Sequence, residues 1–175
     1  MKFRDIPQFI SHGSYQVDVQ MEYLIKWIDE MVREEGLQLC PDFQRGHVWT
    51  EEQQVKYIEF VLRGGKTGKT IYLNNPNWHG VQPNGEYNDF VCVDGLQRIT
   101  AVRRFLNDEI RVFGYLYSEF EDETDIIRHS LAVNINDLKT KREVLQWYIE
   151  MNAGGTPHSE EEIARVKKLL EECKN

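Results

Sequence analysis

The sequence of 175 residues predicts an α+β domain with a small mixed sheet and packed helices. Several segments place apolar residues at helical spacing, and several short apolar runs have the length of buried strands. These segments do not follow a strict strand–helix alternation, which argues against a doubly wound fold. The 41% apolar content favours a folded chain, and residues 1–175 are long enough for a single domain with a buried core.

The N-terminal third is predicted to contain an extended segment, a helix and a short strand. Residues 15–19 are compatible with a strand, and apolar side chains then recur at helical spacing from Met21 to Val32 until Gly36 stops the helix. Residues 37–40 form a predicted strand that ends before Pro41, because a proline forces the preceding residue toward extended geometry.

The middle of the chain is predicted to alternate helices with short strands. Thr50 and Gln53 have the spacing of a capping box, and the helix that they begin ends at Gly64. The predicted elements that follow are a strand at 70–73, a loop rich in Asn, Pro and Gly over 74–89, a strand at 90–93 and a helix over 96–107.

The last third is predicted to contain two strands and two helices. Alternating apolar residues predict the strands, and the pairs Thr140/Glu143 and Ser159/Glu162 are further capping boxes. The predicted bounds are 110–117 and 128–135 for the strands, 140–151 for the first helix and 159 onward for the second.

The stretch RGGKTGKTIYL, residues 63–73, contains Gly68-Lys69-Thr70 but does not form a phosphate-binding P-loop. The motif G-x-x-x-x-G-K-[ST] requires a glycine where this chain has Arg63. A P-loop also leaves a strand and enters a helix, whereas this segment leaves a predicted helix and enters a strand. We expect a glycine-rich connection with solvated lysines.

The features that allow a protein to bind an anion occur instead at Asp94-Gly95, where a predicted strand turns into a helix. Gly95 allows a phosphate to approach the first-turn amides, and Arg98 can donate charge-assisted hydrogen bonds. Asp94 can hold a divalent ion or orient a water molecule. The alternative is an ordinary turn in which Asp94 caps the helix and Arg98 is solvated.

Two other segments are candidates for function. The connection PDFQRGHVW, residues 41–49, combines aromatics with Gln44-Arg45, and such loops often carry function. The alternative is that its aromatics anchor the loop to the core. The segment MNAGGTPHS, residues 151–159, is accounted for largely by a helix end and a following N-cap.

Charge and cysteine content limit the function classes. The net charge of −8 makes strong binding of duplex DNA unfavourable without a local basic patch. The three cysteines are far apart with no CxxC spacing, which indicates free thiols in a reducing compartment. No signal peptide or long apolar run is present, so we expect a cytoplasmic protein without membrane contact.

Taken in order, the motifs PDFQRGHVW, VDGLQRIT and YIEMNAGGTPHS resemble the N-terminal domain family of GmrSD-type modification-dependent restriction systems, whose signature is DGQQR. The resemblance covers about residues 37–163. It implies a ParB/sulfiredoxin-like fold that binds a nucleoside triphosphate with Mg²⁺ and hydrolyses it. The stand-alone length fits a member that a phage could encode, acting in restriction or counter-defence.

The resemblance assigns roles to residues of the three motifs. Asp94, Gln97 and Arg98 are the expected catalytic residues, and Asp94 is also the expected metal ligand. The expected nucleotide-binding residues are Gln44, Arg45, Gly95, Asn152 and Gly155. Leu96 replaces the first Gln of the signature, and its helical spacing predicts that it packs inward. Sulfiredoxin chemistry is not expected, because Cys92 is predicted inside the strand and the loop itself has no cysteine.

Two functional alternatives remain open. The first is a non-enzymatic interaction protein, in which a nucleotide-binding fold regulates a protein partner. The second is a ParB-like DNA-binding protein or nuclease, for which a basic face would have to come from Arg63, Lys66, Lys69 and the Arg103-Arg104 pair.

Overall fold

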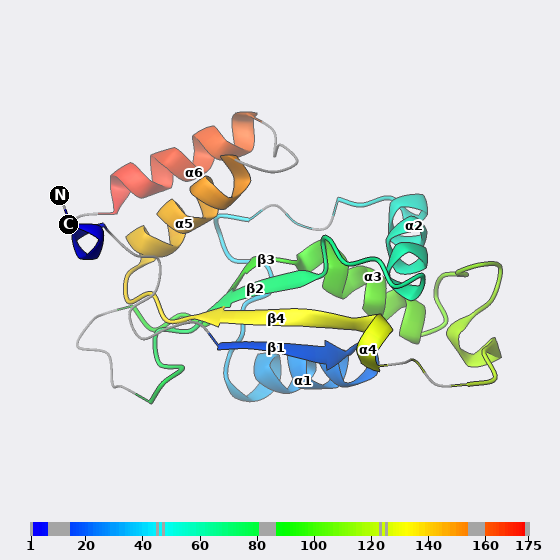
Figure 1. Cartoon of the computed structure of the whole chain (residues 1–175). Helices are drawn as coiled ribbons and strands as arrows, with labels where there is room; N and C mark the ends of the chain where they lie inside the picture. The colour runs from blue at the N-terminus through cyan, green and yellow to red at the C-terminus, as the bar shows by residue number, and fades with distance from the viewer. Residues whose placement is uncertain are drawn as a thin grey trace.

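The computed structural model describes residues 2–6, 15–44, 46, 48–80, 87–122, 124, 126–153 and 160–173. It confirms the α+β class, with a four-stranded mixed sheet and packed helices (Figure 1). In chain order the elements are η1 (Phe3–Asp5), β1 (Tyr15–Gln20), α1 (Met21–Glu34), α2 (Glu51–Leu62), β2 (Thr70–Asn74), β3 (Val91–Asp94), α3 (Leu96–Leu106), η2 (Tyr117–Glu119), α4 (Ile126–His129), β4 (Ser130–Asn136), α5 (Lys141–Ala153) and α6 (Glu160–Glu172).

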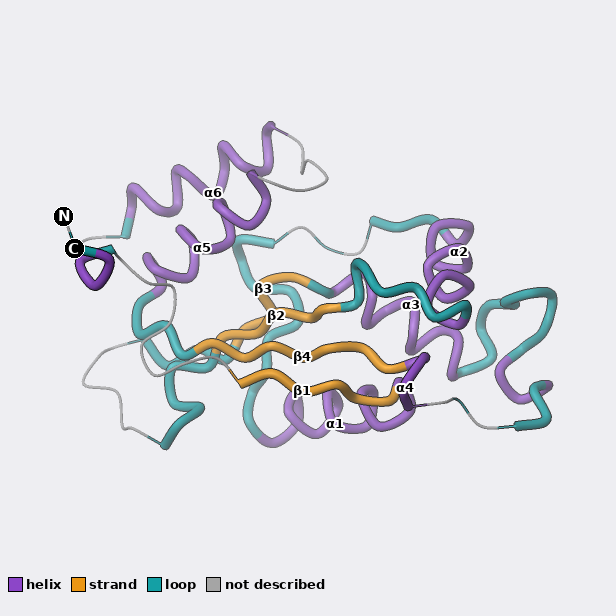
Figure 2. The backbone as a smooth tube through the Cα atoms, in the orientation of Figure 1, coloured by secondary structure: helices purple, strands orange, loops and turns teal. Residues whose placement is uncertain are grey.

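The sheet has the strand order β1-β4-β2-β3 (Figure 2). β4 pairs antiparallel with β1 and parallel with β2, and β2 pairs antiparallel with β3. The register between β2 and β3 shifts between Tyr72 and Leu73. Tyr72 lies opposite Asp94, and the next residue, Leu73, lies opposite Cys92. Such a bulge bends a strand and redirects its side chains. It therefore sets the direction in which Asp94 leaves the sheet.

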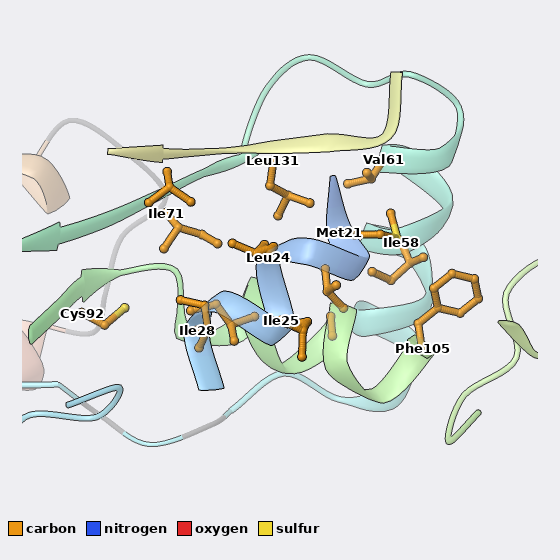
Figure 3. Close-up of a cluster of buried hydrophobic side chains, with 14 of the residues drawn as sticks. Met21, Leu24, Ile25, Ile28, Ile58, Val61, Ile71, Cys92, Phe105 and Leu131 are labelled. Carbon is orange, nitrogen blue, oxygen red and sulfur yellow. The ribbon is translucent and has the colours of Figure 1, made fainter. Parts of the chain in front are cut away.

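The larger hydrophobic core lies between one face of the sheet and helices α1, α2 and α3 (Figure 3). α1 contributes Met21, Leu24, Ile25 and Ile28, whereas Val32 at the end of the predicted stripe is exposed. Gly36 ends that helix with a φ of +70°. The fully buried members labelled in Figure 3 include Met21, Leu24, Ile28, Ile58, Val61, Ile71, Cys92 and Leu131.

A second hydrophobic cluster joins the other face of β3 to α5 and α6. Val91 and Val93 belong to this cluster, while Cys92 between them belongs to the larger core, because successive side chains of a strand point to opposite faces. Phe43 packs edge-on against Tyr148, with ring centroids 5.4 Å apart. Arg165 also donates a 2.9 Å hydrogen bond to the carbonyl of Phe43. The start of the 41–49 loop is thus held between the sheet and the C-terminal helices.

Two predicted strands are wrong. Residues 37–40 form only a single bridge, between Gln38 and Val91, so pairing does not extend. The run at 110–117 turns back on itself at Phe113 and Gly114, which both have positive φ, and Val112 pairs with Tyr115 across that turn. The remaining strand predictions are confirmed to within a few residues, although 126–129 forms the short helix α4 before β4 begins.

The capping predictions at Thr50 and Thr140 are confirmed. The Thr50 hydroxyl accepts from the amide of Gln53, whose side chain accepts in return from the amide of Thr50. The Thr140 and Glu143 side chains exchange the same pair of bonds. The Ser159/Glu162 pair lies outside the described side chains. Among the described residues, no helix is both long and apolar enough to cross a membrane.

Candidate functional site

The turn between β3 and α3 is built around Gly95, which is the N-cap of α3 and has a φ of +128°. A Cβ at this position would lie 3.0 Å from Cγ1 and 3.2 Å from Cα of Ile71 on β2. Both the backbone angle and the close approach therefore require glycine. The alternative in which Asp94 caps the helix is wrong, because the N-cap is Gly95 and Asp94 is the last residue of β3.

An uncapped helix N-terminus has physical consequences for ligands. The first amides of an α-helix have no intrahelical acceptor, and they carry the positive end of the helix dipole. α3 has eleven residues, and no acidic side chain occupies its first turn. An anion placed there would satisfy these amides.

Arg98 is not solvated, contrary to the alternative considered from the sequence. Its Nη1 donates to Asp94 Oδ2 at 2.9 Å and to the carbonyl of Thr70 at 2.8 Å. The side chains of Arg98 and Asp94 are 21% and 33% exposed, so this ion pair is partly shielded from water. Both bonds start from Nη1, which leaves Nη2 to donate to a ligand. The turn thus combines amide donors with a fixed guanidinium group.

Gln97 connects α3 to the 41–49 loop. Its Oε1 accepts from the amides of Val48 at 3.0 Å and Trp49 at 3.1 Å, and its Nε2 donates to the carbonyl of Gly46 at 3.2 Å. These three bonds fix the loop against the helix, and they use three of the four hydrogen bonds that a side-chain amide can make. The predicted role of Gln97 toward a water molecule stays a prediction.

Gln44 connects the same loop to β3. Its Nε2 donates to the carbonyls of Cys92, at 2.5 Å, and Val93, at 2.7 Å. Gln44 and Gln97 therefore bring the 41–49 loop to both sides of the Asp94-Gly95 turn. The two sequence motifs PDFQRGHVW and VDGLQRIT form one structural unit.

Cys92, whose carbonyl accepts the bond from Gln44, is fully buried. Burial raises the pKa of its thiol to about 12, and the charge of Asp94 adds to the effect. The thiol is therefore protonated at neutral pH, and the thiolate is the nucleophilic form of cysteine. This agrees with the expectation that the site does not carry sulfiredoxin chemistry.

The described part of the third motif reaches the 41–49 loop through Tyr148, whose ring packs against Phe43. Asn152 uses its Nδ2 to donate a 2.7 Å hydrogen bond to Tyr148 within α5. Arg45 and Gly155 lie outside the described residues. Leu96 is only half-buried, so the expectation that it packs inward with the α3 stripe is wrong. An apolar side chain is thus partly exposed beside the turn.

Tyr57 is a residue next to the 41–49 loop that the sequence analysis did not single out. Its hydroxyl is buried without a hydrogen-bond partner among the described residues, and its ring lies 5.3 Å from that of Trp49. The inward stripe of α2 runs through Gln54, Tyr57, Ile58 and Val61 at i, i+3, i+4 and i+7. Two polar side chains on that stripe are the signal that could have been used.

The basic residues considered for DNA binding are largely engaged. Arg103 pairs with Asp29, and Arg104 pairs with Glu51 and Glu109. The exposed Lys66 fits the expected solvated connection, but Lys69 instead donates to the carbonyl of Arg128 at 2.9 Å, and burial lowers its pKa. The 63–69 segment does leave a helix and enter a strand, as expected.

The described residues contain no group of three His, Cys, Asp or Glu side chains arranged to hold a metal ion. Asp94 supplies one carboxylate, and its Oδ2 is already bonded to Arg98. Mg²⁺ is often bound by one or two carboxylates together with substrate phosphates and water. The donor set therefore fits a Mg²⁺ ion that a triphosphate brings, and does not form a metal site by itself.

Comparison with known proteins adds one match. The family model described as the N-terminal domain of the GmrSD restriction endonuclease matches residues 28–130, which is more than half of the chain. The matched region includes the 41–49 loop and the β3–α3 turn, and ends before Asn152. No curated protein and no solved structure matches the chain.

Proposed function

Because the chain belongs to the GmrSD restriction endonuclease N-terminal domain family, we propose that it binds a nucleoside triphosphate with Mg²⁺ in a restriction-related role. The observation that carries the proposal is the uncapped N-terminus of α3 beside the partly shielded Arg98. The family supports the link to restriction, and the anion-binding chemistry of the turn supports the ligand.

In this proposal the phosphates lie against the first amides of α3. Arg98 donates to them from Nη2, and its bonds to Asp94 and Thr70 hold the guanidinium in place before the ligand arrives. Gln97 keeps the 46–49 backbone at the site, and Arg45 in the same loop adds a second positive charge. By resemblance to the family, Asn152 and Gly155 of the third motif are also proposed to contact the nucleotide.

The proposed reaction is hydrolysis of the terminal phosphate. The oxygen of a water molecule forms a bond to the γ-phosphorus, and the bond from that phosphorus to the β–γ bridging oxygen breaks. The proton that the water loses passes to a phosphate oxygen or to solvent. The products are a nucleoside diphosphate and inorganic phosphate. Mg²⁺, when bound, neutralises charge on the β and γ oxygens. Arg98 stabilises the charge that develops in the transition state, and Asp94 orients the water or contacts the ion.

Calorimetric titration with each nucleoside triphosphate, with and without Mg²⁺, tests this proposal. We expect binding that needs Mg²⁺ and weakens about tenfold or more in Arg98→Ala, because a charge-assisted hydrogen bond is lost. Arg111→Ala is a matched control, since Arg111 pairs with Glu119 away from the turn, and its affinity should be unchanged. Absence of binding at millimolar nucleotide would refute the proposal.

Hydrolysis needs a separate measurement. Phosphate release should fall strongly in Asp94→Asn, and undiminished release in this variant would show that Asp94 is not needed for turnover. Binding without any turnover in the wild type would favour the non-enzymatic alternative, in which nucleotide controls a protein partner. Duplex DNA binding is disfavoured by the ion pairs of Arg103 and Arg104 and by the net charge of −8.

A further inference from the structure

A groove lies between the edge strand β1 and the outer flank of α1. The helix follows the strand directly and runs back beneath it (Figure 1). The groove has a volume of about 400 Å³, and its walls are formed largely by these two elements. None of the residues that line it belongs to the β3–α3 turn or to the 41–49 loop. It is therefore a separate surface from the candidate nucleotide site.

One wall of the groove is a face of β1. Tyr15, Val17 and Val19 are alternate residues of the strand, so their side chains point to the same face of the sheet. The tyrosine is 43% exposed, and the two valines are half-buried. This wall therefore offers a row of apolar side chains at the spacing of a strand.

β1 is also an edge of the sheet. In the part of the chain that the structure describes, its only strand partner is β4, so the backbone groups on its outer side have no partner in a strand there. Edge strands are commonly protected against further pairing by Lys or Pro. β1 has neither, and its one charged residue, Asp18, alternates with the valines and lies on the face opposite the groove. The edge is thus a template for one more strand.

The other wall is a second stripe of α1, beside the stripe that enters the core. Its members recur at i, i+3, i+4 and i+7, and they are Tyr23, Lys26, Trp27 and Glu30. Residues four apart in a helix are separated by about 6 Å along its axis, and alternate residues of a strand by about 6.6 Å. The stripe can therefore contact every second side chain of an extended segment that lies along β1.

The two charges of this stripe differ in their surroundings. Nζ of Lys26 lies 5.6 Å from the centroid of the Tyr23 ring, which is a cation–π contact. The exposed carboxylate of Glu30 has no ion pair or hydrogen bond with any residue that the structure describes. Together with the net charge of −8, this carboxylate favours a binding partner that carries a basic side chain.

We propose that the groove binds an extended segment of a basic partner protein, which pairs its backbone with the outer edge of β1. Every second side chain of this segment is apolar and lies between β1 and the α1 stripe, and a Lys or Arg pairs with Glu30. Backbone hydrogen bonds to an edge strand supply affinity in this mode of recognition, and pockets for alternate side chains supply specificity. A second copy of this chain is a poorer occupant, because two molecules that each carry a charge of −8 repel one another. The inference goes beyond the proposed function and does not depend on nucleotide binding.

A phage-displayed library of random linear dodecapeptides, selected on the immobilised whole chain, supplies the probe. We expect the enriched peptides to carry apolar residues at alternate positions next to Lys or Arg. An enriched peptide that is added to ¹⁵N-labelled protein should shift the amides of residues 15–19 and 23–30. Absence of enrichment, or shifts centred on other elements, would overturn the proposal.

Methylation of the peptide backbone distinguishes strand addition from adhesion to an apolar surface. Two versions of the enriched peptide carry N-methyl groups on one or the other alternate set of amides, with all side chains kept. The set that faces β1 should weaken binding about tenfold or more, because its hydrogen bonds are lost, and the outward set should have little effect. Affinities within twofold of the parent peptide for both versions would overturn the pairing with β1.

Variants of the protein test the α1 wall. Tyr23 is 63% exposed, so Tyr23→Ala should keep the fold and weaken peptide binding about fivefold or more. Glu30→Gln should weaken it about two- to fivefold, as expected for an exposed ion pair. Glu52→Gln is the matched control, because Glu52 pairs with Lys56 on α2, and its affinity should equal that of the wild type.

Two outcomes with these variants contradict the proposal. Equal peptide affinities of Tyr23→Ala and the wild type would show that the peptide does not occupy the groove. A dimer of the chain in sedimentation equilibrium that Tyr23→Ala dissociates would identify a second copy as the occupant. Nucleotide affinity should be the same in Tyr23→Ala as in the wild type, so failure of the proposed function and failure of this inference are distinguishable.

Discussion

Gly95 joins β3 to α3 under two constraints that no other amino acid meets. Its backbone has positive φ, and the space next to its Cα is filled by Ile71. A side chain would either strain the turn or push β2 away from β3. The bond from Arg98 to the carbonyl of Thr70 spans the same two strands, so a disturbance at Gly95 would also reach Arg98.

Gly95→Ala should therefore lower the free energy of unfolding by about 1–3 kcal/mol, because strain and overpacking act together. Gly68→Ala is the matched control, since Gly68 also has positive φ but no atom lies within 4 Å of its would-be Cβ. Its loss should be smaller, about 1 kcal/mol. Urea denaturation measures both, and equal losses would show that contact with Ile71 is unimportant.

The reactivity of the three cysteines tests whether Cys92, next to the same turn, is buried. Cys40 is exposed, Cys173 is half-buried and Cys92 is fully buried with a pKa of about 12. A thiol reagent at pH 8 should label Cys40 quickly and should reach Cys92 only when the protein unfolds. Mass spectrometry of the labelled peptides identifies the sites. Fast labelling of Cys92 in the native protein would contradict its buried position.

The raised pKa of Cys92 also has a consequence for stability. The folded state keeps the proton at pH values where the unfolded state loses it, so the unfolded state binds fewer protons and stability falls as pH rises. The contribution is complete below the unfolded pKa of about 8.5. It is lost progressively toward pH 12. Urea denaturation of the wild type and Cys92→Ala between pH 7 and 10 should show a steeper loss in the wild type.

The position of a single residue in the candidate site could be predicted only where residues close to it in the sequence determine that position. The placement of Asp94, Gly95 and Arg98 at a turn from a strand into a helix follows from local sequence order and is confirmed, whereas their role toward a ligand stays a prediction. The partners of Gln44 and Gln97 come from segments about fifty residues away, which periodicity and capping rules cannot supply.

Among the elements, helices with caps were predicted more reliably than strands. The bonds that begin α2 are exchanged within four residues, so the sequence carries the whole signal. A segment forms a strand only when it pairs with another segment, which is often distant in the sequence. Residues 37–40 lack such a partner beyond Gln38, and the Phe113-Gly114 turn interrupts the run at 110–117. Gly114 was visible in the sequence and marks that interruption.

The attachment of the 41–49 loop to α3 depends on one side chain. Gln97→Ala would leave the amides of Val48 and Trp49 without their acceptor, so this segment should exchange hydrogen faster with solvent. Gln146→Ala is the matched control, because Gln146 is a helical glutamine whose side chain donates to Glu150 on the same helix, away from the 41–49 loop. Hydrogen exchange with mass spectrometry reports both variants. Unchanged exchange at 48–50 in Gln97→Ala would contradict the connecting role.

At the scale of the whole molecule, the candidate site lies where the two hydrophobic clusters meet. Cys92 belongs to one cluster and Val93 to the other, and Gln44 binds the carbonyls of both. The net charge of −8 opposes the approach of a triphosphate. Under the proposed function, we therefore expect binding to rely on the local positive charge of the turn and on an Mg²⁺ ion that neutralises the phosphates. This is why we expect the affinity for nucleotide to depend strongly on Mg²⁺.

Amide chemical shifts measure directly where the nucleotide binds on the protein. ¹⁵N-labelled protein should be titrated with a non-hydrolysable nucleoside triphosphate and Mg²⁺, using each base in turn. We predict that the largest shifts occur at residues 95–99 and 46–49, and that they are greatly reduced in Arg98→Ala. Saturable shifts centred elsewhere, such as on β1 and α1, or no shifts at millimolar ligand, would contradict the placement of the site at the β3–α3 turn.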